Sequence, residues 1–369
     1  MIIKKAVLKN FRNFELLDIC FNSEMNFITG SNGSGKTNII ESISVLSQLK
    51  SFRNADERSI IKWGSDSYFI SLESDDGSIF DVGCGNYGGK LKKRVKINGT
   101  HITRISDYYG KIKTVSFSPD DSEIINGSPD ARRKYFDSVI SKTDNEYLND
   151  IYDFRKINVS RNKVLKEIRE KGDFNCKGEE LDIWDEMFSL KTFNIIKKRF
   201  LFIDEYKELF QSSYEYITGG SEHIYISYSS TFKDCSADDI KKGLKKNRIK
   251  DILNGSSLRG PHRDQYFFKN EDGLFFETFA SQGQKRAAAI SVKNAEKKYL
   301  EKKTSGKCIL LVDDVFSELD EKRRLNMVKE LCSGNQVLFT MVHIDEYYTE
   351  IFKNCRIFDV EKGSVSVRK

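Results

Sequence analysis

The chain has 369 residues, with 61 Lys and Arg against 55 Asp and Glu and a formal net charge of +6. This length can bury a sizeable core and indicates about two domains. No apolar run approaches the ~18 residues of a membrane span, and the first residues lack the apolar core of a signal peptide, so we expect a cytoplasmic protein without a membrane partner. Seven scattered cysteines without a C-x-x-C pair favour reduced thiols over a zinc site or disulfides. The excess of basic charge permits nucleic-acid binding, but an ordinary basic enzyme fits it as well.

The N-terminal region predicts two strands, a glycine-rich loop and a helix. Residues 2–8 and 14–21 alternate apolar and polar positions, as paired strands do. Residues 25–29 are typical of a buried strand, and apolar residues recur at helical spacing over 39–46. The loop between them fits G-x-x-x-x-G-K-[ST] at every fixed position and comprises Gly30, Ser31, Asn32, Gly33, Ser34, Gly35, Lys36 and Thr37.

This loop has the chemistry of a phosphate site. Glycines let backbone N–H groups converge on phosphate oxygens, and the helix N-terminus adds the positive end of its dipole. We expect Lys36 to reach the β- and γ-phosphates of a nucleotide and the Thr37 hydroxyl to bind Mg²⁺. The strand before the loop and the helix after it favour this interpretation over a chance glycine-rich turn.

Residues 67–74 and 79–84 predict further strands, and a strongly basic segment follows them. Five of the seven residues over 90–96 are basic, and Asn98-Gly99 is a strong signal for a hairpin. The hairpin could contact nucleic-acid phosphates through Lys92, Lys93 and Arg94. A solvated sheet edge protected by lysines explains the same residues equally well.

The middle of the chain is expected to be mainly helical. A strand over 112–117 precedes Ser128-Pro129, which predicts a helix start with a serine cap and proline at the first helical position. Long helices are expected over 144–171 and 181–211, and an antiparallel pair of this length would make an arm of roughly 40 Å. The apolar stripes leave open whether the pair is an extended arm or part of a compact subdomain.

A predicted strand over 223–229 precedes a second basic run. Residues 241–250 carry six basic residues and no acid. Such a run is usually a solvated helix face. It could also contact phosphates, and the candidate residues are Lys245, Lys246 and Arg248.

The last third of the chain returns to sheet-like patterns. Residues 309–314 predict a buried strand that ends in two acids, Asp313 and Asp314, while 337–340 predict another strand and 356–367 a terminal hairpin. The start of an alanine-rich helix could receive a γ-phosphate or be an ordinary helix cap. It comprises Ser281, Gln282, Gly283 and Gln284.

The two halves of one nucleotide site lie far apart in this sequence. In P-loop enzymes Mg²⁺ is held by the loop threonine and by an acid at the end of a second buried strand. Asp313 is the candidate acid, yet it lies 277 residues after Lys36. We therefore predict an α/β P-loop head formed by 1–121 plus 251–369, with a mainly helical lobe inserted over 122–250. Asp314 would orient or deprotonate the attacking water, or else cap the following turn.

Several motifs together resemble a known class. The P-loop, the Ser-Gln-Gly-Gln segment, the Asp-Asp pair and Ser-Glu-Leu-Asp at 317–320 occur in the order seen in ABC-type ATPases of the SMC-like class. Further stretches resemble the RecF family of bacterial recombination mediators. These are 8–14 (Leu-Lys-Asn-Phe-Arg-Asn-Phe), 61–64 (Ile-Lys-Trp-Gly), 117–121 (Phe-Ser-Pro-Asp-Asp), 127–133 with its Gly-Ser-Pro and Arg-Arg, 260–264 (Gly-Pro-His-Arg-Asp) and 313–320.

The resemblance implies a mixed-sheet ABC-type head and an ATP- and Mg²⁺-dependent protein of recombinational repair and replication restart. It implies an ATP-dependent homodimer, weak DNA-stimulated ATP hydrolysis, binding to single-stranded, gapped or duplex DNA, and work with RecO- and RecR-like proteins. Ser281 and its neighbours would act on the nucleotide of the twin subunit, and Arg12 and Asn32 would lie near the phosphates. The late γ-phosphate sensor would be Thr340 or His343. Lys285 stands where the family usually has glutamine.

Three other functions fit parts of the pattern. A nucleotide-binding subunit of an ABC transporter does not explain the long helical insertion or the Gly-Pro-His-Arg-Asp segment. An SMC-like DNA-end-processing ATPase would need long coiled coils with a cysteine hook. A small-molecule P-loop kinase does not explain the 277-residue separation of Lys36 and Asp313.

Overall fold

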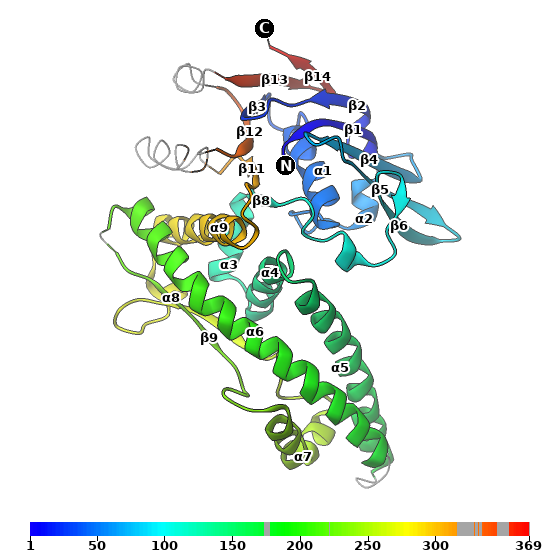
Figure 1. Cartoon of the computed structure of the whole chain (residues 1–369), viewed down its shortest axis with the longest axis vertical. Coiled ribbons are helices and arrows are strands. Elements are labelled where there is room, and N and C mark those ends of the chain that lie inside the picture. Colours follow the sequence, from blue (N-terminus) through cyan, green and yellow to red (C-terminus); the bar gives the residue numbers. More distant parts are fainter. Residues whose placement is uncertain are drawn as a thin grey trace. The chain divides into compact units, whose positions relative to one another are not determined.

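The structure, a computed structural model, describes residues 1–172, 178–220, 222–315, 328, 331, 334–344 and 354–368. It divides into two compact units (Figure 1). Unit 1 comprises Met1–Asp121 and Ile290–Lys369, and unit 2 comprises Ser122–Ala289. The division falls inside the helix α9 (Gln282–Thr304).

The first sheet of unit 1 is antiparallel, and its described strands follow the order β2-β1-β4-β5-β6-β7. Core-facing and exposed residues alternate along its strands, as expected for a sheet with one solvated face. The expected strands and the basic hairpin in this region are confirmed. The bounds are β1 Ile3–Phe11, β2 Phe14–Cys20, β4 Ser67–Ser74, β5 Ile79–Tyr87, β6 Lys90–Ile97 and β7 Thr100–His101.

The second sheet of unit 1 has the described order β14-β13-β3-β12-β11-β8, with parallel pairing throughout except for the terminal hairpin. β3 and β11 are buried along their whole length, as interior parallel strands are. Helix α1 contacts strands of both sheets, and α2 and η1 are short. The bounds are β3 Met25–Thr29, β8 Thr114–Phe117, β11 Ile309–Asp313, β12 Gln336–Met341, β13 Cys355–Glu361, β14 Ser364–Val367, α1 Lys36–Gln48, α2 Glu57–Ile60 and η1 Ile105–Asp107.

Unit 2 is mainly helical and also holds a two-stranded antiparallel sheet. The Ser128 hydroxyl accepts a hydrogen bond from the Ala131 N–H, which confirms the expected helix start. The bounds are α3 Glu123–Asn126, α4 Pro129–Ser141, α5 Asn145–Lys171, α6 Gly178–Thr218, α7 Ala237–Asn254, α8 Phe276–Phe279, β9 Tyr225–Ser229 and β10 Gln265–Lys269, and η2 (Pro119–Ser122) leads into this unit.

The two long helices α5 and α6 run antiparallel (Figure 1). Lys198 pairs with Asp144 near the start of α5, and Lys191 pairs with Asp150 further along it. α6 has 41 residues, which makes it about 60 Å long. Because α7 packs against both helices, the pair belongs to a packed helical lobe.

Residues 251–289 lie in unit 2, whereas the sequence analysis assigned them to the head. The physical reason is local. β10 pairs with β9, and the loop before β10 is bound by the guanidinium of Arg199, which donates to the Pro261 carbonyl at 2.8 Å and to Asp264 at 3.1 Å. Arg199 also forms a two-pronged contact with Asp137 of α4. This loop is therefore fixed to the helices of unit 2.

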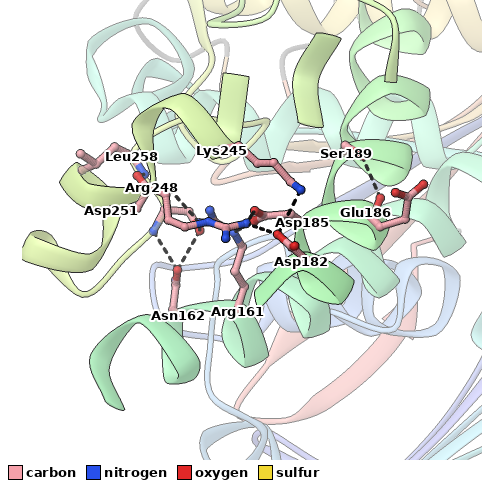
Figure 2. A network of polar contacts seen from close by, with 11 residues as sticks. Arg161, Asn162, Asp182, Asp185, Glu186, Ser189, Lys245, Arg248, Asp251 and Leu258 are labelled. Atoms are coloured by element: carbon pink, nitrogen blue, oxygen red, sulfur yellow. Dashed lines mark hydrogen bonds and ion pairs between the residues drawn. The ribbon is translucent and has the colours of Figure 1, made fainter. Parts of the chain in front are cut away.

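A second buried arginine joins α5, α6 and α7 (Figure 2). Arg161 is fully buried; its Nε donates to Asp185 at 2.8 Å and its Nη1 donates to Asp251 at 2.9 Å. The same Nη1 donates to the Ser257 hydroxyl at 2.7 Å. Arg248 reaches the second oxygen of Asp185 at 2.7 Å. Burial raises the pKa of Asp251, and the Arg161 charge opposes that rise.

Replacing Arg161 with Met should destabilise unit 2 strongly, because Asp251 loses its buried cation and Asp185 retains only Arg248. The expected loss is ~3–5 kcal/mol of unfolding free energy, measured by urea denaturation. Lys163→Met removes an exposed cation of the same helix and should stay within about 0.5 kcal/mol of the parent. Equal urea midpoints for the two variants would contradict a structural role for the Arg161 network.

Candidate functional site

The glycine-rich loop leaves β3 and opens α1. Gly30, Gly33 and Gly35 have φ values of 150°, 79° and 116°, in the region that favours glycine. A Cβ on Gly30 would lie 2.4 Å from the Val360 carbonyl oxygen, so only glycine fits there. The Lys36 ammonium folds back onto the loop and donates to the carbonyls of Gly30 and Ser31 at 2.8 and 2.9 Å.

Asp313 lies at the carboxyl end of β11 and joins two other elements. Its Oδ1 accepts a hydrogen bond from the Thr37 hydroxyl at 2.8 Å and another from the Thr340 hydroxyl at 2.6 Å. Thr340 lies on β12, which pairs with both β3 and β11. Burial raises the pKa of Asp313, and these two hydrogen bonds oppose the rise. The structure thus brings together Thr37 and Asp313, as the spacing argument expected.

Asp314 follows directly and is exposed at the strand end. Its φ of 47° is left-handed, which is uncommon for a residue with a side chain and turns the chain sharply after β11. Burial lowers the pKa of Lys36, and the charges of Asp314 and Asp313 oppose this shift. Both acids therefore lie within electrostatic range of the loop ammonium.

The turn between β1 and β2 is tied to α1. Arg12 places its Nε and Nη2 on the two carboxylate oxygens of Glu41, at 2.9 and 2.7 Å, and Glu41 is fully buried. Asn13 donates to the Ser34 carbonyl at 3.1 Å and accepts from Asn38 at 2.8 Å. Arg12 is thus held beside the phosphate loop by a partner, Glu41, that the sequence analysis did not single out.

Arg53 is a second residue that the sequence analysis missed. Burial raises the pKa of Asp313, and the charge of Arg53 is one of the influences that oppose this rise. The Arg53 backbone N–H donates to the Ser51 hydroxyl, which in turn donates to Glu41 at 2.6 Å. Since Arg53 follows no recognised spacing, only the folded chain shows that it lies near Asp313.

These residues fit a nucleoside triphosphate with Mg²⁺. Among the residues that the structure describes, the buried Ser34 hydroxyl finds no hydrogen-bond partner, and it lies in the loop that leads into α1. The Thr37 and Asp313 oxygens are 2.8 Å apart. Adjacent ligands of octahedral Mg²⁺, each at about 2.1 Å, are separated by about 3 Å. The described residues hold no group of three or more His, Cys, Asp or Glu that could bind a metal. Mg²⁺ usually keeps several waters and binds one or two carboxylates together with phosphate oxygens.

The remaining candidate residues have different surroundings. The Thr340 hydroxyl is engaged by Asp313, while His343 is exposed after β12. In unit 2, Ser281 and Gln284 cap α9 reciprocally: the Ser281 hydroxyl accepts from the Gln284 N–H and Gln284 Oε1 accepts from the Ser281 N–H. The Ser-Glu-Leu-Asp run at 317–320 lies outside the described residues.

The basic hairpin separates its cations onto two faces. Lys92, Arg94 and Lys96 line a groove of about 250 Å³ on the solvated face of the first sheet, together with Asp81 and His101. Lys93 points to the opposite face, where its ammonium contacts the Leu49 carbonyl at 2.7 Å and Glu57 at 2.5 Å. Of the predicted set Lys92, Lys93 and Arg94, only two therefore share a surface.

The second basic run is divided in the same way. Arg248 and Lys245 form ion pairs with acids of α6, whereas Lys246 is exposed. A guanidinium that is paired with the buried Asp185 is not available to a phosphate without breaking that contact.

Comparison with known proteins gives one consistent family. Residues 2–366 match the model described as RecF/RecN/SMC N terminal domain. The chain is 34% identical to the DNA replication and repair protein RecF of Agathobacter rectalis, with 100% of this chain and 99% of the relative covered. It is 33% identical to the protein of the same name from Leptospira interrogans, with 99% of each covered.

Solved structures agree. A structure described as the recombination mediator protein RecF-ATP in the RecFOR pathway aligns with a TM-score of 0.89 and 30% identity, over 100% of this chain and 98% of that one. An Smc head bound to a ScpA domain aligns with a TM-score of 0.53 at 15% identity and shows the fold alone. The mixed sheets and helices of unit 1 are therefore those of an ABC-type head of the SMC-like class. The chain belongs to the RecF family of DNA replication and repair proteins.

Proposed function

We propose that this chain binds ATP and Mg²⁺ at the P-loop, dimerises with the nucleotide between two copies, and acts on single-stranded, gapped or duplex DNA in recombinational repair. The observation that carries this proposal is the meeting of Thr37, Asp313 and Thr340 beside Lys36. Full-length relatives named for DNA replication and repair, and a RecF structure described with ATP, support it. RecO- and RecR-like proteins are the proposed partners.

Each side chain of the proposed site has a separate role at the nucleotide. Lys36 would exchange the carbonyls of Gly30 and Ser31 for β- and γ-phosphate oxygens, which are stronger acceptors. Thr37 and Asp313 would hold Mg²⁺, which neutralises charge that develops on the phosphates. Asp314 would orient the attacking water and accept its proton, giving slow hydrolysis. Arg53 would add positive charge near Asp313, whereas Arg12, whose guanidinium is paired with the buried Glu41, would hold its turn beside the loop.

The family membership weighs against the alternatives. A transporter subunit or a small-molecule kinase would not be expected to match RecF proteins over the full chain. No helix in the described part of the chain is long and apolar enough to cross a lipid bilayer.

Replacing Lys36 with Ala should weaken ATP binding about 10- to 100-fold, because a charge-assisted hydrogen bond of ~1.5–3 kcal/mol is lost. Isothermal titration with a non-hydrolysable ATP analogue measures the affinity. Lys4→Ala, an exposed lysine of the same unit, is the matched control and should bind as the parent does. Parent-like affinity in Lys36→Ala would rule out the P-loop assignment.

Asp314→Asn should retain Mg²⁺ at Asp313 but slow hydrolysis, so that an ATP-bound dimer accumulates. Asn tolerates the left-handed φ of 47° at this position, which keeps the backbone unchanged. Ser281→Arg places a bulky side chain in the proposed sandwich and should prevent dimerisation. Light scattering with and without ATP distinguishes one chain mass from two.

Ser212→Arg, the same substitution at an exposed position of α6, is the control for Ser281→Arg. It should dimerise as the parent does. The sandwich is wrong if Asp314→Asn stays monomeric in saturating ATP, or if Ser281→Arg and Ser212→Arg dimerise equally.

The groove on the first sheet is the proposed DNA surface of unit 1. Binding there would release counterions, so each lost phosphate contact should reduce the slope of log K against log salt by about 0.9 for duplex DNA. Lys92→Ala should show this reduction and Lys93→Ala should not, because the two neighbouring lysines lie on opposite faces. Fluorescence anisotropy at several salt concentrations measures the slope. Identical slopes for both variants would exclude this groove from DNA binding.

A further inference from the structure

The middle of helix α7 contains basic residues and no acidic ones. It begins with a capping box between Ser236 and Asp239 and ends at Gly255, whose φ is 63°. Between these ends, residues 241–250 hold six cations and no acid. Ile240, Leu244 and Ile252 are buried and anchor the helix in unit 2.

Three of the six cations face α6 and are neutralised there. Lys241 pairs with Glu186, Lys245 pairs with Asp182 at 3.3 Å, and Arg248 pairs with Asp182 and with the buried Asp185 at 2.7 Å. Figure 2 shows Lys245 and Arg248 meeting these carboxylates from the α7 side. These three side chains, Lys241, Lys245 and Arg248, form the inner set. Its role is to hold α7 against α6.

The other three cations, Lys242, Lys246 and Lys250, form the outer set. All three are exposed and stand at i, i+4 and i+8, so they follow one another along one line of the helix. In the part of the chain that the structure describes, none of them forms an ion pair. Like charges four residues apart destabilise a helix by ~0.2–0.5 kcal/mol per pair. The two like-charged pairs within the outer set therefore oppose the stability of α7, whereas Lys242 is attracted to Asp239 at the start of the helix.

The orientation of the outer set is fixed. Asp251, one residue after Lys250, is buried and accepts from Arg161 and from the Leu258 N–H. Together with the Arg248–Asp185 contact, this prevents α7 from turning about its own axis. The three lysines of the outer set therefore face one direction, and binding through them needs no further ordering of the α7 backbone.

The spacing of the outer set matches a nucleic-acid strand. Four residues of α-helix advance about 6 Å. A DNA strand carries one phosphate per ~3.4 Å of helix axis, and because the strand also winds around that axis, consecutive phosphates are about 6–7 Å apart in space. A regular line of three positive charges at this interval is matched by a regular polyanion, whereas an acidic protein patch has no fixed repeat.

We propose that the outer set of α7 is a DNA-docking surface that contacts consecutive phosphates of one strand, while the inner set holds the helix against α6. This inference rests on the DNA binding proposed above and assigns it a surface in unit 2. It also replaces the earlier candidates Lys245 and Arg248 by Lys242 and Lys250, and keeps Lys246.

Two triple variants with the same change in charge test the proposal. Lys242, Lys246 and Lys250 are replaced by Gln in one, and Lys241, Lys245 and Arg248 by Gln in the other. The outer variant should reduce the slope of log K against log salt by about 2 for a single-stranded oligonucleotide, at ~0.7 per phosphate, with an unfolding midpoint no lower than that of the parent. The inner variant should lower the unfolding midpoint and keep the parent's slope.

Since the inner triple variant could fail to fold, the neighbouring single variants Lys245→Gln and Lys246→Gln repeat the comparison. Only Lys246→Gln should change the slope. The proposal is overturned if the outer variant keeps the parent's slope, or if inner and outer variants change it equally. If the parent itself shows no salt-dependent binding to DNA, the proposed function fails rather than the assignment of its surface.

Discussion

The parallel pairing of β3, β12 and β11 is the constraint on which the proposed nucleotide site depends. It places the end of the P-loop strand, the Thr340 hydroxyl and the Asp313 carboxylate at one edge of a single sheet. Parallel strands cannot be joined by a tight turn, so the chain must leave the sheet and return. Here the excursion between β8 and β11 is long enough to form unit 2. The helical lobe therefore occupies one of the crossover connections of the parallel sheet, although a connection of about a dozen residues would have joined the two strands.

Two buried arginines and their carboxylate partners hold elements of unit 2 together, in addition to its apolar core. Arg161 and Arg199 are almost completely buried, and each is matched by two carboxylates. Buried ion pairs gain little net stability, but leaving one member unpaired is costly, so they specify a single arrangement. Burial also lowers the pKa of His262 to about 4, and its Nε2 lies 3.0 Å from the Ser257 carbonyl. Arg161 holds the loop at 255–264 at Ser257, and Arg199 holds it at Asp264.

The sequence predicted the parts of the site that follow a motif or a strand end. The proximity of Thr37 and Asp313 could be predicted because a P-loop is usually paired with an acid on a second buried strand, and their roles at a nucleotide stay a proposal. Which basic residues of β6 and α7 share a surface was not predicted correctly from the sequence. Lys93 shares one face of β6 with Leu91 and Val95, a signal that the sequence analysis did not use and that would have separated Lys93 from Lys92 and Arg94. The inner set of α7 could not be separated from the outer set, because the separation depends on acids 55–66 residues away. Arg53 and Glu41 carry no spacing signal at all.

Glu41 connects three parts of the proposed nucleotide site. Its carboxylate receives the fork of Arg12 and the hydroxyl of Ser51, so the turn at the end of β1, the turn that carries Arg53 and the helix behind the P-loop are clamped at one point. Any shift of α1 when phosphates enter the loop must carry both arginines with it. Glu41 is close to the phosphate-binding end of α1, because it follows Thr37 by only four residues. Glu41 therefore links the position of α1 to the positions of the two turns that carry Arg12 and Arg53.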